Sequence, residues 1–224
     1  MSLLRAVILD FDGVIIESNG LKTLAFERVF VRFPDQADHM MAYHHAHVSD
    51  SRFAKFEYLV TQRLGLSTDS PIIAELAEAF SAEMMRLIDS CPMVPGAEEF
   101  LSSVSAQVPV YLASVTPQAE LQAILERRGF GQSFVGVYGC PPWTKPQAIR
   151  TIRESLGGAE GVVFVGDSAG DQRAALETGV EFLGRDSGLP FDPPKPRLFP
   201  DMHAVLEAIA PRLPLESGHP VIEH

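Results

Sequence analysis

The stretch AVILDFDGVIIES, residues 6–18, constrains the fold of this chain more than any other. Its apolar run is typical of a strand that is buried on both faces. The run ends in two carboxylates, Asp10 and Asp12, and the chain then turns at Gly13. Because burying an unpaired ionised carboxylate costs several kcal/mol or more, something must compensate these charges. The sequence therefore predicts a buried strand that delivers two acidic groups to a functional site.

From residue 95 onward, strand-like and helix-like segments alternate. The expected strands cover residues 108–114, 134–139, 161–167 and 179–184. The expected helices cover residues 95–104, 118–128, 146–156 and 201–213, and residues 172–177 form part of a further one. Such alternation favours an α/β fold, a Rossmann-like parallel sheet with right-handed crossovers. The proline-rich residues 190–200 are expected to form a surface loop, and the tail from Pro214 is expected to be frayed.

The segment between the first strand and Pro92 has a different pattern. Apolar residues at helical spacing fill residues 21–33, 52–64 and 72–88, and no strand pattern is visible there. We therefore expect an all-helical domain over residues 16–91, inserted into a core domain made of residues 1–15 and 92–224.

Composition narrows the class of protein. With 224 residues, 46% of them hydrophobic and 21% charged, the chain resembles a soluble globular protein. The net charge of -11, without a basic cluster, argues against binding nucleic acid. No apolar run approaches the roughly 20 residues of a membrane-spanning helix. No signal peptide precedes the first strand, and the two cysteines lack CxxC spacing, so we expect a cytoplasmic protein with reduced thiols that does not bind membranes.

Polar residues follow several of the expected strands. Ser114 ends one strand, Asp167 with nearby Asp171 ends another, and Lys145 lies just past a third. Open parallel sheets bind ligands at these carboxyl ends, so the side chains are expected to meet Asp10 there. Simpler interpretations exist for each: a turn at the first motif, a solvated lysine, or helix capping at Asp171.

The next helix could be capped by Thr116, with Pro117 in its first position. Its N-terminus would then present N–H groups to an anion, with the Ser114 hydroxyl beside them. Because Thr116 is so close, either hydroxyl could serve this anion site. We favour Ser114, which ends the apolar strand and leaves Thr116 available to cap the helix.

The expected charge cluster indicates its ligands. Two unit charges 4 Å apart repel by about 4 kcal/mol at an effective dielectric of 20. A hard divalent cation removes this penalty, and Mg²⁺ prefers carboxylates, waters and a substrate phosphate. A lysine, a hydroxyl and a helix N-terminus beside the cation would together receive a phosphoryl group.

These residues resemble those of the haloacid dehalogenase (HAD) superfamily. DFDGV, Ser114, Lys145-Pro146 and GDSAGD occur in the order found there, and the closest resemblance is to phosphatases of the phosphoglycolate phosphatase type. The resemblance implies a helical C1-type cap inserted after the first strand. It also implies that Asp10 is the nucleophile and that Asp12 is the general acid/base.

The resemblance further implies the binding roles. Ser114 and Lys145 would hold phosphoryl oxygens. The magnesium ligands would be the carboxylates of Asp10 and Asp167, the main-chain carbonyl of Asp12, and Asp171 either directly or through water. The implied function is a magnesium-dependent phosphatase that hydrolyses a small phosphorylated metabolite, of the phosphoglycolate or sugar-phosphate type, through an aspartyl-phosphate.

The helical segment holds candidate substrate-reading residues. Arg52 and Lys55 are three residues apart and would share a helix face, where they could bind a second anionic group. The alternative is a solvated basic face. His44, His45 and His47 have no partner at zinc-like spacing, so we expect them in a polar loop.

Other functions fit parts of the pattern. A phosphosugar mutase would use the same acyl-phosphate, whereas a dehalogenase would need neither Asp12 nor a metal. A phospho-accepting signalling module also clusters aspartates, a hydroxyl and a lysine on a parallel sheet, but the helical insert and the late GDSAGD argue against it. The sequence leaves the substrate and the oligomeric state open.

Overall fold

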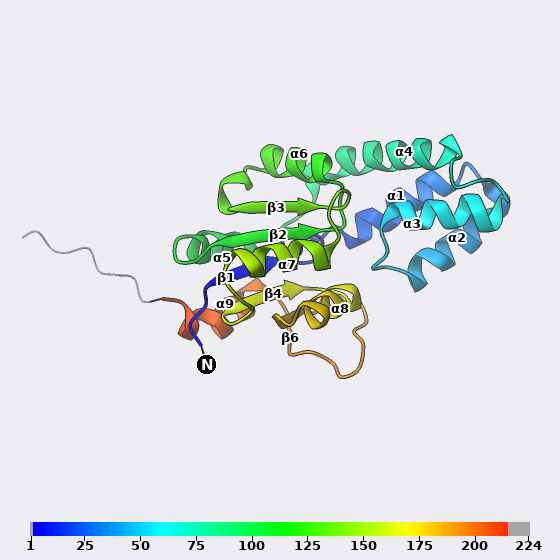
Figure 1. Cartoon of the computed structure of the whole chain (residues 1–224). Helices are drawn as coiled ribbons and strands as arrows, with labels where there is room; N and C mark the ends of the chain where they lie inside the picture. The colour runs from blue at the N-terminus through cyan, green and yellow to red at the C-terminus, as the bar shows by residue number, and fades with distance from the viewer. Residues whose placement is uncertain (1, 215–224) are drawn as a thin grey trace, which may run out of the picture.

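The computed structural model describes residues 2–214. The tail from Pro214 onward was expected to be frayed, and apart from Pro214 it lies outside the described residues. The centre of the structure is a six-stranded parallel sheet with the order β3-β2-β1-β4-β5-β6, so the predicted α/β fold is confirmed (Figure 1). The strands are β1 (Ala6–Leu9), β2 (Val110–Ser114), β3 (Gly136–Gly139), β4 (Val162–Gly166), β5 (Glu181–Arg185) and β6 (Leu198–Phe199).

Strand β1 lies at the centre of the sheet. Its residue Leu9 pairs with Leu112 of β2 and with Val165 of β4. The chain runs from β1 outward to β2 and β3 and then returns to β4 on the other side of β1. A ligand site in a parallel sheet forms where the strand order reverses in this way, at the carboxyl ends of the strands.

Strand β6 lies inside residues 190–200, where only a loop was expected. Its two residues pair with Gly184 and Arg185 of β5 at the edge of the sheet. A strand of two residues has no detectable alternation, so only the tertiary pairing identifies it.

Helices cover both faces of the sheet and extend beyond one end of it. Helices α7 and α8 pack against one face, around Ile8 and Phe164, while α5 and α9 pack against the other, around Val7 and Leu9. The helices of this part are α5 (Ala97–Ser105), α6 (Gln118–Arg128), α7 (Lys145–Ser155), α8 (Ala169–Thr178) and α9 (Met202–Ile209), and short 3₁₀ turns lie at Gly131–Ser133 and Ala210–Arg212. None of the helices within residues 2–214 is long and apolar enough to cross a membrane.

The helical block, defined here as α1 to α4, lies beyond the carboxyl ends of the strands (Figure 1). Its helices are α1 (Asn19–Phe30), α2 (Pro34–Ala46), α3 (Arg52–Tyr58) and α4 (Pro71–Leu87), with a π-helical turn at Leu59–Arg63 and a 3₁₀ turn at Ile88–Ser90. Four buried phenylalanines, Phe26, Phe30, Phe56 and Phe80, pack together at its centre. The exact domain boundaries, residues 16 and 91, stay a prediction.

Helix α2 corrects the sequence analysis. The histidines expected in a polar loop belong largely to this helix: His44 and His45 form its last turn, and His47 follows it directly. Only Met40 and His44 of α2 are buried, so its sequence carries almost no apolar periodicity. The helix forms because it packs along α1, which local sequence does not encode.

Candidate active site

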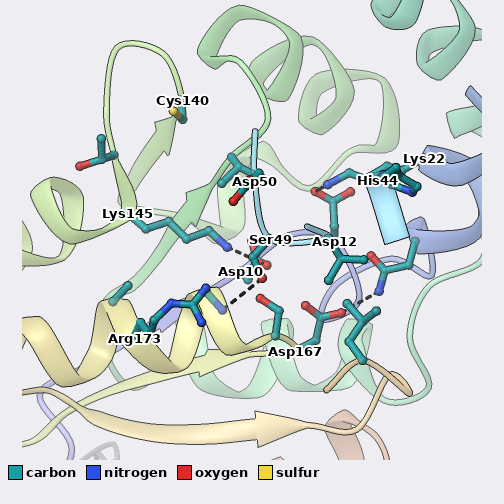
Figure 2. Close-up of a pocket in the computed structure, with 18 of the residues that line it drawn as sticks. Asp10, Asp12, Lys22, His44, Ser49, Asp50, Cys140, Lys145, Asp167 and Arg173 are labelled. Carbon is teal, nitrogen blue, oxygen red and sulfur yellow. Dashed lines mark hydrogen bonds and ion pairs between the residues drawn. The ribbon is translucent and has the colours of Figure 1, made fainter. Parts of the chain in front are cut away.

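A cavity of about 610 Å³, called here the main cavity, lies between the strand ends and the helical block (Figure 2). Asp10, Asp12, Lys145 and Asp167 line its floor, and residues of the helical block, including His44, form part of its wall. Lys145 and Asp167 are more than a hundred positions after Asp10 in the sequence, and the parallel sheet brings the three together. The predicted convergence of Asp10, Lys145 and Asp167 is present in the structure.

Asp10 follows β1 directly and is almost completely buried. One carboxylate oxygen accepts a hydrogen bond from the main-chain N–H of Phe11 at 2.7 Å, and the other lies 2.9 Å from Lys145 Nζ. Lys145 is the first residue of α7, whose N-terminus is fixed by a capping box between Thr144 and Gln147. The same ammonium also pairs with Asp171.

The pKa values show the cost of gathering these groups. Burial, and next the charge of Asp171, raise the pKa of Asp10 well above its usual value, although Lys145 acts in the opposite direction. Burial and Asp171 also raise the pKa of Asp167 to about 6. Burial alone would lower the pKa of Lys145, but Asp10 and Asp171 outweigh it and raise that pKa. The carboxylates therefore lack enough positive charge when Lys145 is their only neutraliser.

The same carboxylates fit a metal ion. Asp10, Asp167 and Asp171 each place one oxygen within 4.8 Å of the other two. Asn19 Nδ2 donates to Asp167 Oδ2 at 2.7 Å, and the backbone N–H and hydroxyl of Ser168 donate to Asp171, so both side chains are fixed. A set of three buried carboxylate oxygens suits a hard cation such as Mg²⁺.

Gly13 shows how closely the backbone approaches this cluster. Its φ of +71° favours glycine, and a Cβ at this position would overlap the carboxylate of Asp167. The turn after β1 can therefore bring the main chain of the DFDGV motif against Asp167 only because residue 13 has no side chain.

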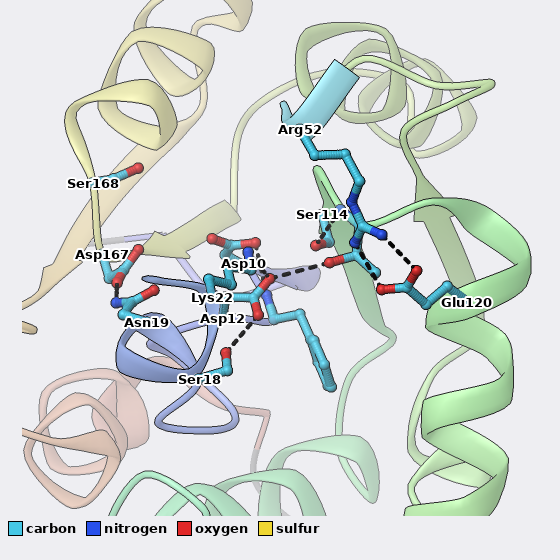
Figure 3. A network of polar contacts seen from close by, with 12 residues as sticks. Asp10, Asp12, Ser18, Asn19, Lys22, Arg52, Ser114, Glu120, Asp167 and Ser168 are labelled. Atoms are coloured by element: carbon cyan, nitrogen blue, oxygen red, sulfur yellow. Dashed lines mark hydrogen bonds and ion pairs between the residues drawn. The ribbon is translucent and has the colours of Figure 1, made fainter. Parts of the chain in front are cut away.

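The carboxylate of Asp12 does not belong to this cluster of three and lies beside Lys22 and Ser18 (Figure 3). Lys22 Nζ lies 2.5 Å from Asp12 Oδ2, and the hydroxyls of Ser18 and Thr116 donate to the two carboxylate oxygens. Burial alone would raise the pKa of Asp12, but the charge of Lys22 and the hydrogen bonds from Lys22 and Ser18 outweigh it and lower that pKa. Because the carboxylate of Asp12 is already paired, only the main-chain carbonyl of this residue remains as a candidate metal ligand.

The hydroxyls after β2 correct the expected capping. The N-cap of α6 is Pro117, which has no capping side chain, and Thr116 instead donates to Asp12 Oδ2 at 3.2 Å. Ser114 is buried at the end of β2, and its Oγ accepts the main-chain N–H of Thr116 at 3.1 Å. Thr116 is therefore tied to the site through Asp12, and the argument for Ser114 from the capping role of Thr116 was wrong. A phosphate-binding role for Ser114, which does not line the main cavity, stays a prediction.

Sequence reasoning missed Ser18, Asn19 and Lys22. All three lie at the start of α1, where Asn19 and Lys22 are three positions apart and so face the same side of the helix. Their polarity immediately after the DFDGV motif was the available signal. It was hidden because the same residues also suit a solvated helix start.

Arg52 and Lys55 are both buried, so the alternative of a solvated basic face is wrong. Arg52 forms two hydrogen bonds of 2.7 Å with the carboxylate of Glu120 on α6 and one with Ser81, as Figure 3 shows for Glu120. Lys55 Nζ lies 3.0 Å from His44 Nδ1. Neither side chain lines the main cavity, and a substrate role for them stays a prediction.

Comparisons with known proteins extend this picture. Similar solved structures include a predicted phosphoglycolate phosphatase from Haemophilus somnus (TM-score 0.74, 17% identity, 93% of this chain and 99% of that one). A hydrolase from Pseudomonas syringae (TM-score 0.74, 17%, 92% and 98%) and CbbY from Rhodobacter sphaeroides in complex with phosphate (TM-score 0.69, 17%, 91% and 96%) are also similar. At such identities the likeness concerns the fold.

A comparison of the sequence with family models identifies the family of this chain. Comparison with curated proteins yields no significant match. The model of the haloacid dehalogenase-like hydrolases, in contrast, matches residues 4–179, which include every residue of the cluster around Asp10. This chain therefore belongs to the haloacid dehalogenase-like hydrolases.

Proposed function

We propose that this hydrolase is a magnesium-dependent phosphatase that acts on a small phosphorylated metabolite through an aspartyl-phosphate on Asp10. One observation carries the proposal: Asp10 faces a large cavity between a lysine, two further carboxylates and a second, separately held aspartate. A nucleophile, a charge-neutralising group and a proton carrier are the parts that phosphoryl transfer needs.

Asp10 is the nucleophile in this proposal. One of its carboxylate oxygens attacks phosphorus, and the bond between phosphorus and the leaving oxygen breaks. Lys145 and the Ser114 hydroxyl hold the phosphoryl oxygens during this displacement. Asp10, Asp167, Asp171 and the main-chain carbonyl of Asp12 would hold Mg²⁺, which when bound neutralises charge on the carboxylates and the phosphoryl group.

Asp12 carries the proton. The leaving oxygen takes a proton through Asp12 and departs as an alcohol. Lys22 keeps Asp12 ionised in the free protein, so this proton enters with the substrate, because phosphate monoesters with a second pKa near 6 remain partly protonated at neutral pH. In the second step, water attacks phosphorus and gives its proton to Asp12, and the bond between phosphorus and Asp10 breaks.

The test is hydrolysis of an aryl phosphate. The wild-type protein with Mg²⁺ should release inorganic phosphate, whereas Asp10→Asn and an EDTA-treated sample should release none. The matched control is Asp186→Asn, which removes an acidic residue outside the cluster and should retain turnover. Undiminished turnover by Asp10→Asn would refute the mechanism.

The phosphosugar mutase alternative predicts a different product. A mutase would return the phosphoryl group to a sugar phosphate, would need a bisphosphate activator, and would release little phosphate. Phosphate release in proportion to substrate consumed therefore supports the phosphatase.

A further inference from the structure

A second, smaller recess adjoins the main cavity on the side of Asp12. It measures about 40 Å³ and shares Lys22, His44, Val48 and Asp50 with the wall of the main cavity. Its volume is sufficient for a small polar group and too small for a sugar ring. Any group bound in it would lie in the helical block beside the leaving-group side of the phosphoryl centre.

The inner wall of the recess contains a buried ammonium group. The Lys55 side chain is 2% exposed, and its Nζ lies 3.0 Å from His44 Nδ1 and 4.9 Å from the centre of the Phe26 ring. Within residues 2–214, no carboxylate forms an ion pair with Lys55, although the partly buried Asp50 lines the same recess. Burying a cation without a paired anion is costly, so this position favours an incoming negative charge.

His44 fixes the direction of this ammonium. Because the ammonium can only donate, His44 Nδ1 must accept, and Nε2–H then donates to Thr23 Oγ1 at 3.1 Å. Burial, and next the charge of Lys55, lower the pKa of His44 to about 3, which keeps the ring neutral and able to accept. His44 is thus a positioning residue for Lys55.

Arg52 does not compete for the same anion. Its guanidinium already binds Glu120 and Ser81, and it lies over the ring of Phe80. Of the two cations predicted to read the substrate, Lys55 is therefore the one whose charge is not yet paired by a carboxylate.

The recess also adjoins the proposed proton carrier. Lys22 and Thr116 both contact Asp12, and both line the recess. A leaving oxygen that receives its proton through Asp12 would have its next one or two carbon atoms at the mouth of this recess.

We propose that Lys55, positioned by His44, binds a carboxylate on the leaving group, so that the preferred substrates are short phosphorylated hydroxy acids. This inference rests on the proposed phosphatase function. A carboxylate fits the recess better than a second phosphate because it is smaller and planar and carries a single charge to match a single ammonium.

The first experiment compares two substrates on the wild-type protein. 2-Phosphoglycolate and its amide differ in one charge and hardly in size. The kcat/KM for the acid should exceed that for the amide at least tenfold, because a hydrogen bond to a charged group contributes about 1.5–3 kcal/mol. Equal values for the two substrates would overturn the inference.

The second experiment removes the ammonium. Lys55→Met should lower kcat/KM for the acid tenfold or more and leave the amide and an aryl phosphate nearly unchanged. Lys55→Arg should retain part of the preference, and Arg63→Met, which removes an exposed cation of the helical block, should retain all of it. A loss of activity on all substrates alike would assign Lys55 a structural role and overturn the inference.

A third comparison distinguishes the anions. A sugar bisphosphate and the corresponding monophosphate should be hydrolysed with similar kcat/KM, and a strong preference for the bisphosphate would refute the carboxylate assignment. Failure of the phosphatase proposal is separately visible, because the wild-type protein would then not hydrolyse the aryl phosphate at all.

Discussion

At the scale of single residues, Lys22 lowers the pKa of Asp12 through an ion pair with this buried carboxylate. Replacing it with methionine leaves Asp12 buried without its cation, so the pKa of Asp12 should rise. We expect Lys22→Met to lower kcat for an aryl phosphate about 10²-fold, the lower range for a disturbed general acid/base. Steady-state kinetics with Lys195→Met as the control measures this, and an unchanged kcat would exclude Lys22 from the proton-transfer machinery.

Lys55 makes a prediction about stability and pH. Burial, and next the charge of Lys22, lower its pKa from 10.5 to about 7 in the folded protein. Between those values the unfolded chain binds a proton that the folded protein does not, so this group makes stability rise with pH from about 7 to 10. Lys55→Met should reduce that rise and stabilise the protein at pH 7 by up to a few kcal/mol.

Urea unfolding at pH 7, 8, 9 and 10 measures this effect. Other titrating groups contribute equally to both proteins, so the difference between wild type and variant isolates Lys55. If the free energy of unfolding changes with pH equally in the two proteins, Lys55 has an ordinary pKa.

At the scale of secondary-structure elements, the pair Arg52–Glu120 joins α3 of the helical block to α6 beside the sheet. Its two side chains are 5% and 8% exposed, so removing one partner leaves a buried charge. Glu120→Leu should therefore destabilise the protein by about 3 kcal/mol, whereas the double change Arg52→Met, Glu120→Leu should cost much less than the two single changes together. Urea unfolding of the four proteins gives the coupling, and additive losses would show that the pair is not coupled.

Elements were predictable where local chemistry marks their ends. Residues 118–128 match α6 because Pro117 and Gly129 flank the helix, and β1, β2 and β4 are apolar runs too short for helices. Helix α2 and strand β6 were missed because the first has little apolar periodicity and the second has two residues. Both depend on contacts with distant segments.

The site divides in the same way. The convergence of Asp10, Lys145 and Asp167 was predictable because each residue lies at or shortly after the end of an expected strand, and the topology of the sheet brings those strand ends together. Ser18 and Lys22, which contact the Asp12 carboxylate, could not be predicted, because their positions depend on how the start of α1 turns back toward β1. The Arg52–Glu120 pair likewise requires knowing that two distant helices meet.

At the scale of the whole molecule, binding of the proposed Mg²⁺ to the three clustered carboxylates would couple folding to the metal. Mg²⁺ that binds the folded chain alone should raise the melting temperature, by the equivalent of about 2.7 kcal/mol at a hundred times Kd. Asp167→Asn should remove most of this shift, and Asp192→Asn, outside the cluster, should not. Thermal unfolding with and without Mg²⁺ checks it, and an equal shift in both variants would place the ion elsewhere.

The glycine after the DFD tripeptide has a consequence for variation at this site. Because any larger residue at position 13 collides with Asp167, a library randomised at that codon and selected for hydrolysis should return a single amino acid. The backbone turn beneath the carboxylates would then be closed to substitution, so new substrate preferences would have to arise from the helical block.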